Sequence, residues 1–183
     1  LAEQMAECLD RGAATAFKTA KIKFTPTSLT GGTWATNGTA GAEALVNLTK
    51  AHLGLIRDYM TQDIHIPFYE GDHYVGIFAT KALRGLKDDR VIEAWNMYLR
   101  KGDLLYRSEV GRVESIRLVE NVNSNALTNG IGSGSVLGEG VIFGDEAVTR
   151  VEVDAPELRA DPNYQGDFGR IKAVAWYGIL AFG

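Results

Sequence analysis

The sequence predicts an α+β fold made of an elongated layer and a rounder lobe. Two stretches, residues 2–20 and 42–62, place apolar side chains at the i, i+3, i+4 and i+7 spacing of helices. Residues 74–79 form an apolar run without alternation, which is typical of a strand covered on both faces. From Val110 onward the pattern changes to strands, and residues 171–182 close the chain with an apolar strand. This order of elements is typical of an α+β protein.

Composition defines the general class of protein. The 183 residues are 45% hydrophobic and 23% charged, the balance of a soluble globular protein with one domain or two small lobes. A net charge of −4 argues against a dedicated nucleic-acid reader, which needs clustered Lys and Arg. Cys8 is the single cysteine, so an intrachain disulfide and a multi-thiolate zinc site are excluded. No apolar run approaches the roughly 20 residues of a membrane span, and no signal peptide opens the chain.

Residues 42–62 are predicted to form the longest helix. Thr39 is its candidate N-cap, and Pro67 lies beyond its end as a stop signal. At about 1.5 Å per residue this helix would run roughly 30 Å. In the first helix, residues 2–20, Gly12 leaves two interpretations open, two short helices or one bent helix.

The segments beside these helices have other signatures. Residues 24–41 contain Pro, Gly and Asn-Gly pairs that predict turns and loop, with Trp34 anchoring the loop to its own domain. A short helix is predicted after Thr80, and another is predicted to start at Asp88 or Asp89. Both have apolar faces suited to a core.

The second half reads as strands separated by polar segments. Residues 121–135 are an Asn-, Ser- and Gly-rich loop, and residues 136–143 and 147–153 are predicted strands or a strand–helix mixture. Pro156 and Pro162 frame a segment predicted to be irregular. The terminal strand is hydrophobic enough that we expect it to be buried in a sheet.

No catalytic, cofactor-binding or metal-binding residues are assigned from the sequence. The glycines of residues 130–140 lack the Lys of a phosphate loop, because neither Lys nor Arg occurs between Ala126 and Thr149. A flexible surface loop is the favoured interpretation. Acidic and histidine side chains gather near one turn, but a solvated loop is favoured over a metal site there; they are Asp63, His65, Asp72 and His73.

Three phrases of the sequence resemble major capsid proteins of tailed bacteriophages. Residues 66–77 read IPFYEGDHYVGI, residues 108–120 read SEVGRVESIRLVE, and residues 166–178 read GDFGRIKAVAWYG. Their order and spacing are similar to those in capsid proteins of certain podophages and prophages. The resemblance covers roughly residues 40–183.

The resemblance implies the Hong Kong 97-type capsid fold, with a long spine helix and a mixed central sheet flanked by helices. Residues 1–41 would be an N-terminal helical and loop segment, and residues 42–73 the spine helix of the peripheral domain. Residues 74–165 would form the axial-type lobe, and residues 166–183 a terminal strand that returns to the peripheral domain.

The implied function is structural and not enzymatic. The chain would be a subunit of an icosahedral virion capsid, assembled in the bacterial host cytoplasm, with no cofactor and no membrane. Its partners would be copies of itself in hexamers and pentamers, DNA enclosed without sequence-specific binding, and scaffolding, portal or decoration proteins. We expect an adaptable polar loop at the ring centre to serve assembly, formed by Asn121, Asn123, Asn125, Asn129 and Gly130.

One departure from the family bears on this interpretation. Capsid proteins of this type carry an N-terminal arm and an extended loop that reach over neighbours, and residues 1–41 fit neither. Because both reaching elements are missing, we expect a C-terminal portion of a longer capsid protein. The start at Leu1 fits a truncated, processed or incompletely resolved product. Two alternatives stay open: an encapsulin-like compartment shell with the same fold, and a small α+β binding module.

Overall fold

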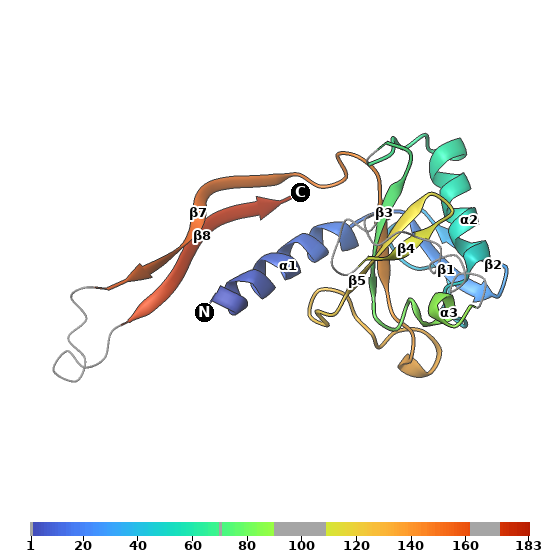
Figure 1. The fold of residues 1–183 in the computed structure, drawn as a ribbon, viewed down its shortest axis with the longest axis horizontal. Coiled ribbons are helices and arrows are strands. Elements are labelled where there is room, and N and C mark those ends of the chain that lie inside the picture. The colour runs from blue at the N-terminus through green and yellow to red at the C-terminus, as the bar shows by residue number, and fades with distance from the viewer. Residues whose placement is uncertain (1, 70, 90–108, 162–172) are drawn as a thin grey trace.

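The computed structural model describes residues 2–69, 71–89, 109–161 and 173–183. A rounded lobe lies at one end, and the helix α1 (Ala2–Lys18) extends from it beside a ribbon of β7 (Arg150–Ala160) and β8 (Val174–Phe182) (Figure 1). The chain is therefore α+β, as the sequence predicts. The first helix is one continuous element that runs through Gly12.

The lobe is built on a four-stranded mixed sheet. β3 (Tyr74–Ala79) lies between β5 (Ile116–Asn121), to which it is parallel, and β6 (Gly140–Phe143), to which it is antiparallel. β4 (Glu109–Val113) pairs with the other side of β5. Every β3 side chain except Ile77 is buried, which confirms the prediction of a strand covered on both faces.

A tight turn joins β4 to β5. Its two residues, Glu114 and Ser115, have positive φ angles of 51° and 57°. Two consecutive positive φ values are the type I′ geometry, which matches the twist of a two-residue hairpin. The strands predicted from Val110 onward are thus confirmed as a hairpin at this point of the chain.

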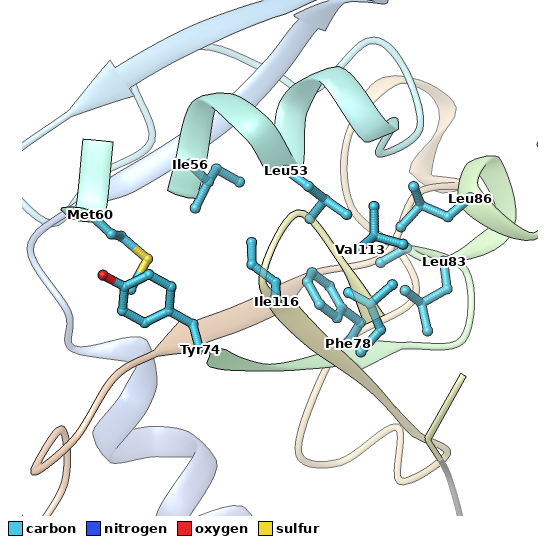
Figure 2. Packing of buried hydrophobic residues seen from close by; sticks show 11 residues of the cluster. Leu53, Ile56, Met60, Tyr74, Phe78, Leu83, Leu86, Val113 and Ile116 are labelled. Carbon is cyan, nitrogen blue, oxygen red and sulfur yellow. The ribbon is translucent and has the colours of Figure 1, made fainter. Parts of the chain in front are cut away.

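The core lies between the sheet and the helix α2 (Lys50–Asp58). Leu53 and Ile56 of α2 point towards Ile116 on β5 (Figure 2). Complete burial of such side chains stabilises a fold by about 1.5–3 kcal/mol each. The cluster comprises Leu53, Ile56, Met60, Tyr74, Phe78, Ala82, Leu83, Leu86, Val113, Ile116 and Leu118.

The helix predicted over residues 42–62 is wrong in its first eight residues, because α2 starts at Lys50. Its N-cap is Thr49 and not Thr39. The helix continues as the single π-helical turn η1 (Tyr59–Asp63). The nine residues of α2 span about 14 Å, against roughly 30 Å for the predicted helix.

Tertiary hydrogen bonds explain the late start of α2. The Leu45 amide donates to the Pro26 carbonyl at 3.0 Å, and the Ala44 carbonyl accepts from the Ser133 amide at 2.8 Å. Leu45, placed on the predicted apolar stripe, is 57% exposed. Residues 42–49 favour a helix by composition, but these contacts with other segments hold them out of it.

The loop predicted over residues 24–41 is wrong for its first part. β1 (Lys23–Ser28) and β2 (Gly31–Ala35) form an antiparallel hairpin there. Pro26 and Gly32 lie opposite each other in it. A two-stranded ribbon consists of edge strands, where Pro and Gly are tolerated, so turn-forming residues did not prevent pairing.

Trp34 fixes this hairpin to the lobe. Its indole stacks on Tyr59 with ring centroids 4.1 Å apart and lies 4.7 Å from the Phe24 ring. The prediction that Trp34 anchors its segment to its own domain is confirmed.

The helix predicted after Thr80 is confirmed as the short α3 (Arg84–Lys87). The helix predicted from Asp88 or Asp89 extends into residues 90–108, which lie outside the described part.

The C-terminal ribbon corrects two predictions. β7 runs through Pro156 to Ala160, where an irregular segment was expected, and a register shift between Asp154 and Glu157 accommodates the proline. The terminal strand is confirmed from Val174 onward, but its burial is wrong. β8 pairs with β7 alone among the described strands, and alternate side chains are exposed.

Candidate assembly surface

The β7–β8 ribbon carries apolar side chains that the described chain leaves uncovered. Val153 is 77% exposed and Leu158 is 57% exposed. The other exposed apolar side chains of the ribbon are Val151, Val174, Tyr177 and Ile179. An isolated two-stranded ribbon is marginally stable in water, and clustered exposed apolar groups mark interaction sites. The ribbon is therefore the candidate assembly surface.

The two faces of the ribbon differ in their cover. Trp176, Leu180 and Phe182 of β8 line a groove of about 550 Å³ together with residues of α1. The helix side of this groove is lined by Cys8, Leu9, Gly12, Thr15, Ala16 and Thr19. Tyr177 and Ile179 project to the opposite face, because side chains alternate along a strand. None of the described helices lies over that face in Figure 1.

α1 is fixed mainly at its C-terminal end. The Phe17 ring lies 4.8 Å from the Phe143 ring of β6, and Lys18 forms an ion pair with Glu139 at 2.5 Å. Further along, a Cβ at Gly12 would lie 3.1 Å from the Phe182 ring, so that glycine permits the helix to approach β8 closely. Ala14 is the single buried residue of α1.

Charge on the ribbon is confined to β7. Arg159 bonds Glu157 at 2.5 Å and Asp154 at 3.4 Å, and its guanidinium lies 4.4 Å from the centroid of the Tyr177 ring. The hydrogen bond with Glu157 raises the pKa of Arg159 further above its usual range. Such exposed pairs add little to stability, because solvent screens them. Their consequence is that β7 carries charges of both signs while β8 carries none.

The predicted assembly loop divides into two parts. The Asn121 side chain accepts from the Asn123 amide at 2.7 Å, and that of Asn123 accepts from the Asn125 amide at 3.0 Å. These consecutive turns bring the first three asparagines together, and Asn125 is exposed. Ala126 and Leu127 follow and are buried.

Asn129 and Gly130 lie beyond this buried pair. The Asn129 side chain accepts from the Lys81 amide at 2.9 Å, so Asn129 supports the turn before α3. Gly130 is exposed. The assembly role of these five residues stays a prediction, and Asn125 and Gly130 are the two with exposed positions.

The sequence did not single out His52, which is completely buried. Its Nδ1 accepts from the Thr49 amide at 3.1 Å, which places the ring proton on Nε2 and lets it donate to the Ser28 carbonyl at 2.8 Å. The ring therefore caps α2 and ties the helix to the β1–β2 hairpin. In the sequence, the position of His52 three residues after Thr49 was the one feature that could have indicated this capping role.

The turn that gathers acidic and histidine residues does not form a metal site in the part of the chain that the structure describes. His73 is buried and lies 3.3 Å from the exposed Asp72 carboxylate through its Nδ1. This hydrogen bond lowers the pKa of the Asp72 carboxyl. His65 stays exposed with a φ of 58°.

Comparisons with known proteins add no relative. No protein-family model, curated protein or solved structure matches this chain. Within the described ranges, no helix is long and apolar enough to cross a membrane.

Proposed function

We propose that this chain is a structural subunit of a tailed-bacteriophage capsid with the Hong Kong 97-type fold. The subunit joins copies of itself into rings and a closed shell that encloses DNA. The observation that carries the proposal is the projecting β7–β8 ribbon, whose apolar side chains the described part of the chain leaves exposed. The resemblance of residues 66–77, 108–120 and 166–178 to phage capsid proteins supports a capsid as the assembly that the ribbon serves.

In this proposal the four-stranded sheet belongs to the axial lobe, and α2 with η1 serves as a short spine helix. In place of the arm and extended loop of the family, α1 and the ribbon would reach over a neighbouring subunit. The sequence of residues 1–41 did not predict this role for α1. Both extend from the lobe in the same direction, so a neighbouring subunit could contact them together (Figure 1). A net charge of −4 suits a container that holds its DNA without gripping phosphates.

Assembly of the purified chain tests the proposal. We expect concentration-dependent oligomers in light scattering after size exclusion, and rings or closed shells in negative-stain electron microscopy. A paired variant, Val153→Lys with Leu158→Lys, should reduce assembly, whereas Leu29→Lys, in the β1–β2 turn and 68% exposed, should not. A monomer at every concentration would refute the proposal.

The contents of any shell distinguish a capsid from a compartment. We expect nuclease-protected DNA inside shells formed in cells that also express the packaging proteins. Shells that instead retain a specific enzyme would favour an encapsulin-like compartment.

A further inference from the structure

Among the described strands, none besides β7 pairs with β8, although α1 lies beside the strand (Figure 1). The Ala173 carbonyl accepts from the Asp161 amide at 3.0 Å, and Gly183 exchanges hydrogen bonds with Thr149 at 2.7 and 3.0 Å. Backbone groups alternate in direction along an antiparallel pair, so odd-numbered β8 residues bond to β7 and even-numbered ones point outward. The outward set is Val174, Trp176, Gly178, Leu180 and Phe182. No backbone hydrogen bond from a described residue reaches them from the outer side.

The two edges of the ribbon are built differently. β7 contains Pro156, two register irregularities and five charged residues, all of which hinder pairing with another strand. β8 has nine residues with no charge and no proline. The hindering features thus lie on one edge alone, and the β8 edge remains competent to pair.

We propose that two copies of this chain pair antiparallel through their β8 edges. The pairing would produce a four-stranded sheet in the order β7, β8, partner β8, partner β7. This pairing rests on the proposed function, because the partner is a second copy only if the chain assembles with itself. Three or more strands are the usual minimum for an independently stable sheet, and this pairing supplies a fourth.

Charge and length favour β8 of a second copy as the occupant. β8 against β8 brings two uncharged nine-residue edges together and places Tyr177 and Ile179 of both copies on one face. Other described edges match less well: β4 carries Glu109 and Arg112, while β2 and β6 have only five and four residues. A contact of identical surfaces is isologous and has a twofold axis, as closed assemblies use.

Cysteine crosslinking tests the pairing and its register. In a Cys8→Ser background, single cysteines replace Tyr177 or Ile179, alone and mixed, with Val151→Cys on β7 as the comparison. Opposed Cβ atoms of an antiparallel pair lie about 4.5–5.5 Å apart, within disulfide reach. A twofold pairing opposes Tyr177 to itself or to Ile179 of the partner, so one combination should crosslink about tenfold faster than Val151→Cys. Equal rates on β7 and β8, or no crosslink, would overturn the pairing.

A charge variant gives an independent measurement. Ile179→Lys brings two like charges near the twofold axis, and we expect the dimer dissociation constant from sedimentation velocity to rise at least about tenfold. Leu29→Lys, outside the ribbon, should leave it unchanged; an equal effect of both variants would contradict the inference. Shells without β8 crosslinks would remove the pairing and keep the capsid proposal. Crosslinked dimers that never form shells would support the pairing and refute the capsid proposal.

Discussion

His52 joins α2 to the β1–β2 hairpin, and replacing it with alanine tests how far the lobe depends on one buried ring. The ring accepts from the Thr49 amide, donates to the Ser28 carbonyl and lies 5.8 Å from the Phe24 ring. In His52→Ala both backbone groups lose their partner, and a cavity replaces the imidazole. The hydrogen bond from Thr49 Oγ1 to the Leu29 carbonyl and the stack of Trp34 on Tyr59 would still connect the β1–β2 hairpin to α2 and η1.

The size of the effect follows from these contacts. A buried polar group left without a hydrogen bond costs about 1–3 kcal/mol, and two such groups arise here. Partial relaxation and entry of water offset part of this cost. We therefore expect His52→Ala to lower the free energy of unfolding by about 3–5 kcal/mol. For a chain of 183 residues this lowers the melting temperature by roughly 6–20 °C.

Urea denaturation followed by tryptophan fluorescence and circular dichroism measures the change. His65→Asn is the matched control, because His65 is exposed and asparagine tolerates its positive φ, and its effect should stay within about 0.5 kcal/mol. His52→Gln should lie between the two, since its amide can replace one of the two bonds. A loss below about 1 kcal/mol for His52→Ala would refute the capping role.

Three further predictions concern single contacts. Trp34→Ala removes the stack on Tyr59 and should cost about 2–4 kcal/mol in the same urea assay; an unchanged midpoint would show that the hairpin is not anchored by the indole. Ser115→Gly relieves a positive φ in the type I′ turn and should raise stability by about 0.5 kcal/mol in calorimetry, whereas a loss would argue against that turn. The pKa of Asp72 should lie below its usual 3.8 in a carbon NMR titration and return towards 3.8 in His73→Asn. Because the folded-state pKa is lowered, this contact stabilises the fold above pH 3.8 and its contribution is lost as pH falls through the folded value; equal pKa values would contradict it.

The elements that could be predicted are those whose residue types reveal their environment within a short segment. β3 was recognisable because its neighbours bury both faces, which leaves a continuous apolar run. Trp34 was recognisable as an anchor because an indole in a polar segment needs a partner. The start of α2 was not predictable, since residues 42–49 have helical composition but bond to distant backbone groups at Pro26 and Ser133.

The surface of the ribbon was harder still to predict. Exposed and buried apolar strands have the same composition, so β8 was expected in a sheet interior. Pro26 and the glycines of β1 and β2 likewise suggested a loop, whereas a two-stranded hairpin, which no other described strand joins, tolerates them. His52 escaped notice because its role depends on a carbonyl 24 positions earlier in the chain.

The strand order of the lobe has a consequence for synthesis on the ribosome. β3 lies between β5 and β6, and its partners Ile116 and Phe143 come 42 and 68 positions after Tyr74 and Val75 respectively. A nascent chain therefore cannot complete its sheet until β6 has left the exit tunnel, because β3 pairs with two strands that are translated later. β7 and β8 are translated after that point. The lobe can thus fold before the ribbon with its exposed apolar side chains is complete. This order shortens the time in which an incompletely folded subunit can associate with its neighbours.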